Sequence, residues 1–222
     1  MNKTRIGLAV LLIGAVAFGI YYVREQYISA SHRHTREVIL YFTLSRVDNP
    51  IIIVGDSIVE ASTLPRELCG HAIVNAGLSG ASTTSDLGTW LINALNGKPA
   101  AAIVVSLGTN DALGAARSRP QFEANYSALL AQLSTATAHL IVLAIPSIDI
   151  LHGAPSETEA MGRIDEYNSA LPGLAAQHGA TFAALPPMPT PHTIDGVHLS
   201  ATGYQLWDQA VLQPVSALCG SK

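Results

Sequence analysis

The chain has 222 residues, a formal net charge of −4 and only 13% charged residues, so it lacks the basic surface that binding to nucleic acid requires. Hydrophobic residues make up 49% of it, which is enough for one globular domain with a sizeable core and an appendage. We therefore expect a single domain that does not bind nucleic acid.

The appendage lies at the N-terminus. Lys3 and Arg5 precede an uncharged apolar stretch, Ile6 to Val23, which ends in Tyr21 and Tyr22. As a helix with a rise of about 1.5 Å per residue, this stretch would be roughly 27 Å long, close to the thickness of the hydrocarbon core of a membrane. Paired tyrosines fit the membrane interface. We expect residues 1–24 to form a retained membrane anchor, with the domain on the extracytoplasmic side, in the periplasm or outside the cell.

A cleaved signal peptide is the alternative, and Ile28-Ser29-Ala30 offers an imperfect cleavage site, although the apolar stretch is longer than usual for one. Residues 25–49 carry His32 and His34 among arginines and then an apolar pattern. We expect this segment to be a juxtamembrane linker that enters a short helix. The domain itself is expected over residues 50–222.

From Pro50 onward, strand patterns alternate with helical patterns. We expect strands at Ile51–Val54, Ala72–Asn75, Ala101–Ser106, Leu140–Ile145 and Thr181–Leu185, and helices at Val59–Leu68, Thr84–Leu95, Gln121–Thr137, Glu159–Gln177 and Ser200–Leu218. Alternation with short connections predicts a parallel sheet covered by helices on both faces. The expected fold class is α/β, a three-layer α/β/α sandwich around a five-stranded parallel sheet.

Four polar or glycine-bearing segments follow these strands: Gly55-Asp56-Ser57, Asn75-Ala76-Gly77-Leu78-Ser79-Gly80, Gly108-Thr109-Asn110-Asp111 and Asp195-Gly196-Val197-His198. Parallel strands end at one edge of the sheet, where ligands bind in such folds. Each segment alone has an ordinary interpretation as a helix cap or a turn. Together they supply the groups that acyl transfer needs.

A serine nucleophile needs a base to take its proton, and the base needs a group that holds its tautomer. We assign Ser57 as the nucleophile, His198 as the base and Asp195 as the orienting group. For the oxyanion hole we assign the backbone N–H groups of Ser57 and Gly77 and the amide of Asn110. The order Ser, Asp, His is that of α/β hydrolases, but Gly-Asp-Ser is not their Gly-x-Ser-x-Gly turn.

The four segments, in this order and spacing, resemble the four blocks of the SGNH hydrolase (GDSL esterase/lipase) superfamily, from about Ile51 to Trp207. The resemblance implies a flavodoxin-like sandwich, hydrolysis of esters or thioesters without a metal or other cofactor, and the same roles for the five site residues. Ile58 stands where the family has Leu, and an apolar side chain is kept there.

The chain has two cysteines, Cys69 and Cys219, and in an exported protein such a pair permits one disulfide. The alternative to a disulfide is that the two cysteines stay unpaired and act as small buried apolar residues. We expect the bridge.

The loops Pro146–Thr158 and Pro186–Ile194 are the longest on the ligand side, so we expect substrate specificity to lie there, with His152 and His192 as candidate contacts. The substrate-binding residues themselves stay unknown. We expect the substrate to be a small-molecule, lipid or acylated-glycan ester. His71, His139 and His178 are expected at the surface of the opposite edge.

Three alternatives stay open. The same site could transfer the acyl group to a sugar instead of water. A metal phosphoesterase could use as ligands Asp56, Asn110, Asp111, Asp195 and His198. A non-catalytic glycan-binding module could use the same sheet edge. If the protein is an esterase, Asp56 and Asp111 brace their loops by accepting backbone hydrogen bonds.

Overall fold

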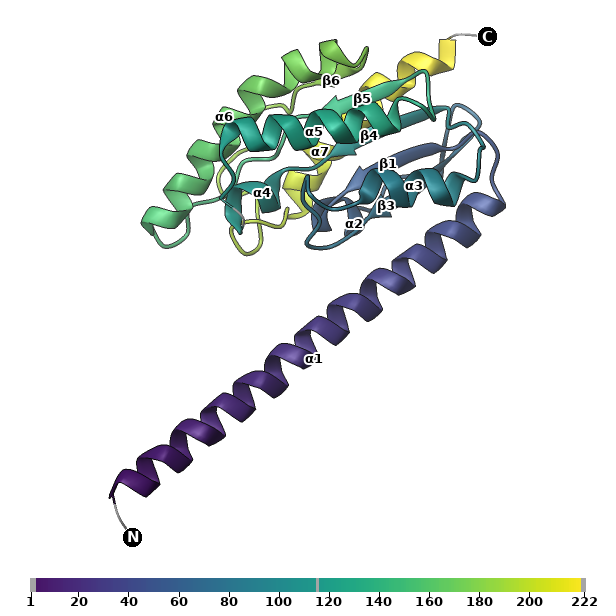
Figure 1. Ribbon diagram of the computed structural model, residues 1–222. Helices are drawn as coiled ribbons and strands as arrows, with labels where there is room; N and C mark the ends of the chain where they lie inside the picture. The colour runs from purple at the N-terminus through teal and green to yellow at the C-terminus, as the bar shows by residue number, and fades with distance from the viewer. Residues whose placement is uncertain (1–2, 115, 221–222) are drawn as a thin grey trace. The chain divides into compact units, whose positions relative to one another are not determined.

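The five residues of strand β1, Ile51–Gly55, are all buried, because helices cover both faces of the sheet to which it belongs (Figure 1). β-branched residues suit such a strand, since they pack well on a pleated surface and need no polar neighbour. The structure is a computed structural model that describes residues 3–114 and 116–220, with side chains described from residue 15 onward except at positions 115, 218 and 220 to 222.

The helices and strands follow one another as α1 (Lys3–Ser45), β1 (Ile51–Gly55), α2 (Ser57–Glu60), β2 (Glu67–Leu68), β3 (His71–Gly77), α3 (Leu87–Leu95), β4 (Ala102–Ser106), α4 (Thr109–Leu113), α5 (Arg119–Leu133), β5 (Leu140–Leu143), α6 (Pro155–Gln177), β6 (Thr181–Ala183), α7 (Ala201–Ser216) and the 3₁₀ helix η1 (Ala217–Gly220). All five expected strands are present, each within a few residues of its predicted position.

The sheet has the strand order β2-β3-β1-β4-β5-β6, and the five longer strands are parallel. Without the short β2, this is the flavodoxin-like order, so the predicted α/β sandwich is confirmed. Parallel neighbours need a crossover connection, and α3, α5 and α6 lie within those connections.

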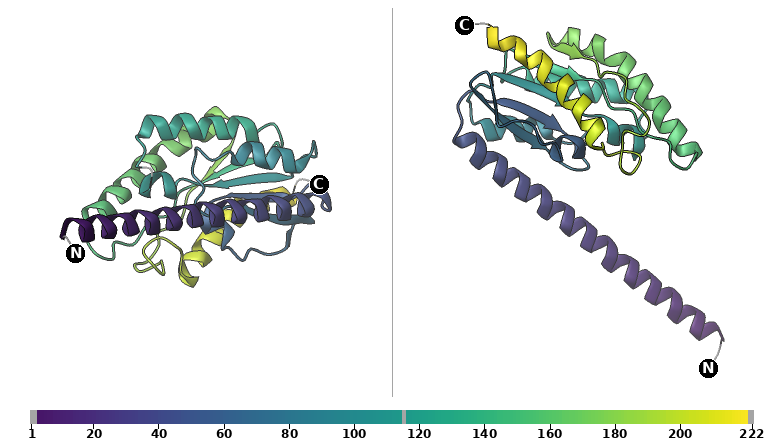
Figure 2. Two further views of the ribbon diagram at one scale, coloured as in Figure 1. Left: turned by 60° about the horizontal axis from the view of Figure 1, so that its bottom comes forward. Right: turned by 180° about the vertical axis from the view of Figure 1, so that it is seen from behind.

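Alternate residues along each central strand face opposite sides of the sheet. Ile52 and Val54 of β1 pack in a core with residues of α3, α5 and α6, whereas Ile51 and Ile53 pack in a second core with α7. Figure 2, right, shows α7 crossing the face that lies behind in Figure 1. These two cores are what makes the sandwich three-layered.

The region between β1 and β3 differs from the prediction. The expected helix Val59–Leu68 ends at Glu60, and Glu67 and Leu68 form a sixth, antiparallel strand against β3. Asn75 Nδ2 donates to the carbonyls of Val59 at 2.6 Å and Glu60 at 3.3 Å, which a longer helix would use for its own bonds, and Pro65 disfavours helical backbone further on. Cys69 and Gly70, with φ of 57° and 81°, make the two-residue turn into β3.

The structure joins Cys69 and Cys219 in a disulfide across a sequence separation of 150 residues. Cys69 lies in the turn before β3, and Cys219 lies in η1 after α7. The bridge thus ties the end of the chain to the edge of the sheet, as the sequence predicts.

Helix α4, Thr109–Leu113, is absent from the prediction, and α3 begins at Leu87 instead of Thr84. In the second case the polar residues before the helix form their own turn: the Ser82 N–H donates to Ser85 Oγ at 3.0 Å, and Thr83 binds Asp111. Side-chain hydrogen bonds of this kind compete with helical backbone bonds.

Residues 3–45 form one continuous helix, α1, where the sequence suggests an anchor followed by a linker with a short helix. The chain divides into two compact units between Ile39 and Leu40, and Leu40 and Leu44 pack in the core of the second unit. In the part of the chain whose side chains are described, no helix is long and apolar enough to cross a membrane. The expected anchor, Ile6 to Val23, begins in residues 6–14, whose side chains lie outside that part.

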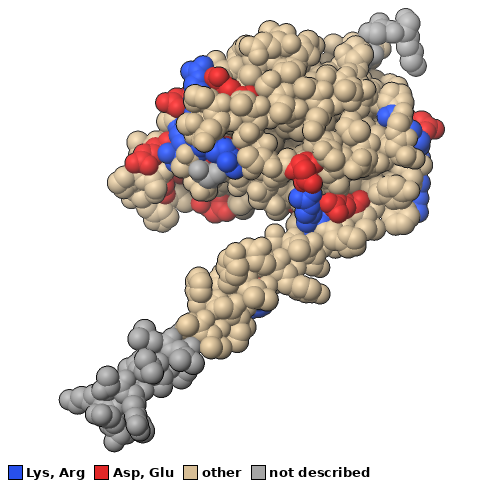
Figure 3. All heavy atoms as spheres, in the orientation of Figure 1, with Lys and Arg blue, Asp and Glu red and all other residues tan. Residues whose placement is uncertain are grey.

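The face shown in Figure 3 is mostly uncharged, and its acidic and basic side chains lie beside one another instead of forming a patch of one sign. This agrees with the low charge content of the sequence.

Candidate active site

The predicted site segments meet at the carboxyl edge of the sheet. Ser57 begins α2 directly after β1, Asn110 lies in the first turn of α4 after β4, and His198 lies in the loop between β6 and α7. Strands β1 and β4 are neighbours. The strand that follows β1 in the chain, β3, lies towards one edge of the sheet, and the strand that follows β4, β5, lies towards the other edge. Ser57 and Asn110 therefore flank the switch point of the strand order, where ligands bind in open α/β sheets.

Ser57, His198 and Asp195 form a hydrogen-bonded chain. His198 Nδ1 lies 2.7 Å from Asp195 Oδ2, and His198 Nε2 lies 3.0 Å from Ser57 Oγ. A carboxylate only accepts, so Nδ1 carries the proton of the neutral ring, and Nε2 is left to accept from the serine hydroxyl. The structure thus brings together all three residues that the sequence assigns, in the geometry that proton transfer from Ser57 needs.

Asp195 is held as a carboxylate although its side chain is half exposed. Its Oδ1 accepts the N–H groups of Val197 at 3.0 Å and His198 at 2.8 Å, while Oδ2 faces the imidazole. Partial burial raises the pKa of Asp195, but the hydrogen bonds from His198 and from the two backbone groups outweigh it and bring the pKa to about 2. The Asp195 side chain is therefore charged at neutral pH.

Asp56 is the residue before Ser57, and it caps α2. Its side chain is buried, with 1% of its surface exposed, and Oδ1 accepts the Ile58 N–H at 3.0 Å. Burial raises the pKa of Asp56 to about 7, against the opposing effects of the Ile58 and Thr109 hydrogen bonds and the nearby His198. Asp56 thus braces the turn that presents Ser57, as the sequence predicts.

Asp111 braces a different loop. It is fully buried, accepts the Thr83 N–H at 2.9 Å and the Thr83 hydroxyl at 2.6 Å, and pairs with Arg117 Nε at 2.8 Å. These bonds tie the segment after β3 to α4, which carries Asn110.

Gly77, whose N–H the sequence analysis assigns to the oxyanion hole, is not open to substrate. A Cβ there would overlap the backbone of Glu60 and Val59, so glycine is needed for close packing against α2 and not for the approach of substrate. The Gly77 N–H also donates to Asn75 Oδ1 at 3.0 Å. The structure therefore does not support Gly77 as an open oxyanion donor.

Gly80, three residues further on, is a better candidate, and the sequence reasoning missed it. It is exposed, it adopts a left-handed φ of 78°, and a Cβ there would have no atom within 4 Å. Among the described residues its N–H has no hydrogen-bond partner. The second glycine of Asn-Ala-Gly-Leu-Ser-Gly was the available signal.

Two contacts fix the position of this glycine. Glu60 of α2 accepts both the N–H and the hydroxyl of Ser79 at 2.6 Å, and Asn110 Nδ2 donates to the Ala81 carbonyl at 2.9 Å. The Asn110 amide has a second N–H, which leaves one donor beside the Gly80 segment.

The remaining histidines do not join the site. His192 is only 2% exposed and lies against Asp149 and Ser147, so it is no surface contact for substrate. His152 is exposed and pairs with Glu157. His71 and His178 bind Asn49 and Ser127, away from Ser57, as predicted.

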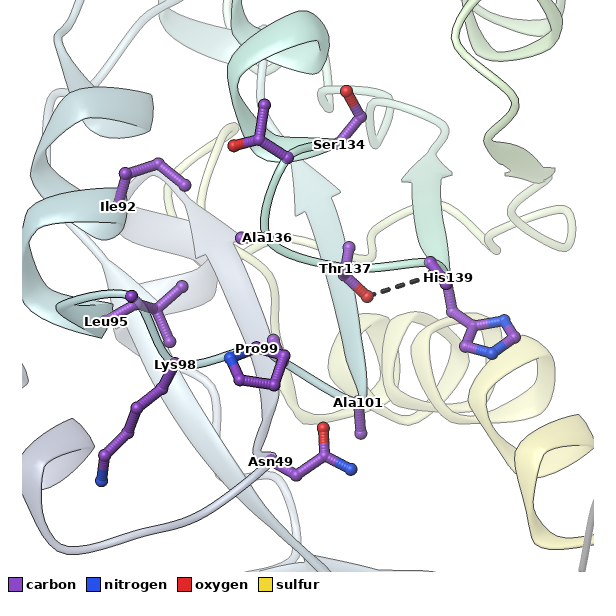
Figure 4. A pocket seen from close by; sticks show the side chains of 14 residues that line it. Asn49, Ile92, Leu95, Lys98, Pro99, Ala101, Ser134, Ala136, Thr137 and His139 are labelled. Carbon is purple, nitrogen blue, oxygen red and sulfur yellow. Dashed lines mark hydrogen bonds between the residues drawn. The ribbon is translucent and has the colours of Figure 1, made fainter.

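A pocket of about 750 Å³ lies at the amino ends of β4 and β5, the edge opposite Ser57. Figure 4 shows Pro99, Leu95 and Ala136 around it, with His139 at one side, where the His139 N–H donates to Thr137 Oγ1 at 3.0 Å. None of the predicted site residues lines this pocket, so it is separate from the triad.

Of the residues considered for a metal phosphoesterase, Asp195 and His198 lie together, but the set forms no metal-binding cluster among the described residues. Over the described residues there is no group of three or more His, Cys, Asp or Glu side chains able to hold a metal ion. Asp111 is already taken by Thr83 and Arg117, and Asp195 by His198.

Comparison with known proteins identifies the family. Residues 53–206 match the GDSL-like lipase/acylhydrolase family model. A search of curated proteins gave no match.

Solved structures share the fold at low identity. A GDSL-like lipase from Bacteroides thetaiotaomicron is 17% identical, with a TM-score of 0.63, and the match covers 76% of this chain and 88% of that one. A member of the lipolytic protein G-D-S-L family from Veillonella parvula is 21% identical, with a TM-score of 0.61 and coverage of 74% and 96%. Axe2, an acetylxylan esterase from Geobacillus stearothermophilus, is 16% identical, with a TM-score of 0.58 and coverage of 76% and 94%.

The buried Asp56 predicts a pH dependence of stability. Its pKa is about 7 in the folded chain against an ordinary value of 3.8, so the folded state holds the proton more tightly than the unfolded state does. The contribution of protonated Asp56 to the free energy of unfolding is then fully present below about pH 4 and is lost as the pH rises to about 7. Three pKa units correspond to a loss on the order of 4 kcal/mol.

The Asp56→Asn variant keeps an oxygen that accepts the Ile58 N–H but cannot ionise. We expect its free energy of unfolding in urea to change less between pH 4.5 and pH 8 than that of the wild type, by a few kcal/mol. Equal pH dependence of the two proteins would contradict a buried, proton-holding Asp56.

Proposed function

Because the chain belongs to the GDSL-like lipase/acylhydrolase family, and is therefore a hydrolase of ester bonds, we propose that it cleaves carboxylic esters through an acyl-enzyme on Ser57. The observation that carries this proposal is the hydrogen-bonded chain from Ser57 Oγ to His198 Nε2 at 3.0 Å and from His198 Nδ1 to Asp195 Oδ2 at 2.7 Å. A binding protein has no need of such a chain.

In the first half of the proposed reaction, Ser57 Oγ attacks the ester carbonyl carbon while His198 Nε2 takes the hydroxyl proton. The carbonyl oxygen becomes an oxyanion, and Asp195 stabilises the imidazolium that forms. When the tetrahedral intermediate collapses, the bond to the alcohol breaks, and His198 gives its proton to the leaving oxygen.

In the second half, a water molecule takes the place of the alcohol. His198 accepts a proton from this water as its oxygen attacks the acyl carbon, and a second tetrahedral oxyanion forms. The bond to Ser57 then breaks, the serine recovers its proton from His198, and the carboxylic acid leaves. Transfer of the acyl group to a sugar would follow the same steps, with a sugar hydroxyl in place of water.

The oxyanion needs donors that are already in place. We assign the Ser57 N–H, the second N–H of the Asn110 amide and the Gly80 N–H, with Gly80 in the place first given to Gly77. Support comes from the exposed, open position of Gly80 and from the bond between Asn110 and Ala81, which is adjacent to Gly80. Donors fixed before the reaction cost no reorganisation when the charge develops.

We also propose that the hydrolase domain works on the extracytoplasmic side. The Cys69–Cys219 disulfide supports this, since such bridges persist in oxidising compartments. The described apolar side chains Val16, Phe18 and Ile20 of α1 are exposed, which suits a segment that takes up an apolar environment. An acylated glycan or a lipid ester of the cell envelope would then be the accessible substrate.

Replacement of Ser57 by alanine removes the nucleophile. We expect kcat on a short-chain model ester to fall by about 10⁴-fold to 10⁶-fold, and labelling by a fluorophosphonate probe to disappear. Ser134→Ala is the control, because Ser134 is exposed and lies after α5 at the opposite edge. If Ser57→Ala kept a tenth of the rate, Ser57 would not be the nucleophile.

Replacement of Asn110 tests the oxyanion hole. Asn110→Ala removes one donor and is expected to lower kcat by about 10²-fold to 10³-fold. Asn110→Asp keeps the shape but replaces the amide donor with an acceptor, so it should lose at least as much. A rate above one tenth of the wild type in either folded variant would argue against Asn110 as a donor.

The proposed location predicts the state of the cysteines in cells. With the full chain expressed in a bacterial host, a thiol-alkylating reagent added before lysis should leave Cys69 and Cys219 unmodified. Reduction before alkylation should modify both. Two alkylated cysteines without reduction would contradict an extracytoplasmic domain.

A further inference from the structure

The loop between β6 and α7 carries two members of the candidate triad but has almost no regular structure. Asp195 and His198 lie within residues 184–200, where the only strand-like pairing is an isolated bridge between Thr193 and Leu199. A loop of this kind needs other contacts to hold a base within hydrogen-bonding distance of Ser57.

Asp149, in the loop after β5, supplies such contacts. It is 4% exposed, and its Oδ2 accepts three hydrogen bonds: from the N–H of His192 at 2.8 Å, from the N–H of Thr193 at 2.8 Å and from the Thr193 hydroxyl at 2.6 Å. Bonds to a buried carboxylate are among the stronger hydrogen bonds in proteins.

The Thr193 hydroxyl links Asp149 to Gly196, the residue after Asp195. While it donates to Asp149, its oxygen accepts the N–H of Gly196 at 3.1 Å, and the Gly196 carbonyl accepts the Asp149 N–H at 2.9 Å. Gly196 is buried and follows Asp195 directly. Both polar groups of the Gly196 backbone are therefore restrained by Asp149: the carbonyl directly, and the N–H through the Thr193 hydroxyl.

His192 closes the same network from the other side. Its Nε2 lies 2.9 Å from the Ser147 carbonyl oxygen and forms a hydrogen bond with it, whereas its Nδ1 lies 3.1 Å from Asp149 Oδ1 without making a hydrogen bond to it. The His192 carbonyl accepts the Ser200 N–H at 2.8 Å, and the His198 carbonyl accepts the Ile194 N–H at 2.8 Å. The two ends of the segment 192–200 are therefore fixed together.

Burial raises the pKa of Asp149, but the hydrogen bonds from Thr193 and His192 lower it by more, so the carboxylate is charged at neutral pH. Among the described residues, the hydrogen bonds of Asp149 and Thr193 lead to His192 and Gly196, and none of them reaches Ser57.

We propose that Asp149 and Thr193 are positioning residues: the Thr193 hydroxyl, held by the Asp149 carboxylate, fixes Gly196 and thereby keeps Asp195 and His198 in line with Ser57. The inference rests on the proposed function, because it assigns a purpose to the loop that carries the base.

Two substitutions at one position separate the hydroxyl from the bulk of the side chain. Thr193→Val keeps the shape but removes the donor to Asp149 and the acceptor for Gly196, whereas Thr193→Ser keeps both. We expect kcat on a model ester to fall about tenfold to a hundredfold in Thr193→Val, with KM within about twofold, because only the alignment of the base is lost. Thr193→Ser should stay within about threefold of the wild type. Equal kcat in the valine and serine variants would overturn the proposal.

A second readout does not depend on activity. The proton between His198 Nδ1 and Asp195 should give a downfield proton NMR signal, assigned by its absence in His198→Ala. We expect this signal in the wild type and in Thr193→Ser, and its loss or broadening in Thr193→Val. An unchanged signal in Thr193→Val would overturn the proposal even if no ester were hydrolysed.

The same experiments keep the two proposals apart. Failure of the wild type to react with a fluorophosphonate at Ser57 would count against the proposed function, while the NMR comparison would still decide the role of Thr193. If Thr193→Val does not fold, as judged by circular dichroism, Asp149→Asn replaces it, since it keeps the size and one acceptor oxygen but loses the charge. It should show the same loss of kcat and of the NMR signal, and wild-type values for both would overturn the inference.

Discussion

The parallel, in-register pairing of β1 with β3 and β4 is the constraint on which the candidate site depends. Gly55, at the end of β1, lies opposite Gly77 on one side and Ser106 on the other, so the three strands end at the same level. A Cβ on Gly55 would overlap the Ser106 carbonyl oxygen. Close contact between the strands thus fixes the level at which β1, β3 and β4 end. Ser57 in α2, the Gly80 segment and Asn110 in α4 follow these strand ends and lie near one another for that reason.

The site combines a buried support with an exposed triad. Asp56 and Asp111 are almost inaccessible and take backbone and hydroxyl hydrogen bonds, whereas the side chains of His198 and Asp195 are 41% and 51% exposed. In such an exposed pair the attraction between charges is screened by water, so geometry has to come from hydrogen bonds to a rigid neighbour. Asp195 receives them from its own loop, and that loop receives them from Asp149 and Thr193.

Sequence reasoning recovered the features that depend on one strand at a time. A β-branched strand followed by Gly-Asp-Ser predicted both the sheet and the place of Ser57, and the common edge of parallel strands predicted the meeting of Ser57, Asp195 and His198. It failed where contact between segments decides the outcome. The crowding of Gly77 by α2, the open position of Gly80 and the burial of His192 against Asp149 all depend on loop paths that no local pattern encodes.

If these loops form one catalytic centre around Ser57, a crystal structure after reaction with a fluorophosphonate will show it most directly. We expect a bond from phosphorus to Ser57 Oγ, with the phosphoryl oxygen about 2.7 to 3.1 Å from the N–H groups of Ser57 and Gly80 and from Asn110 Nδ2. An adduct on another residue, or a phosphoryl oxygen that points away from these donors, would contradict a single centre built in this way.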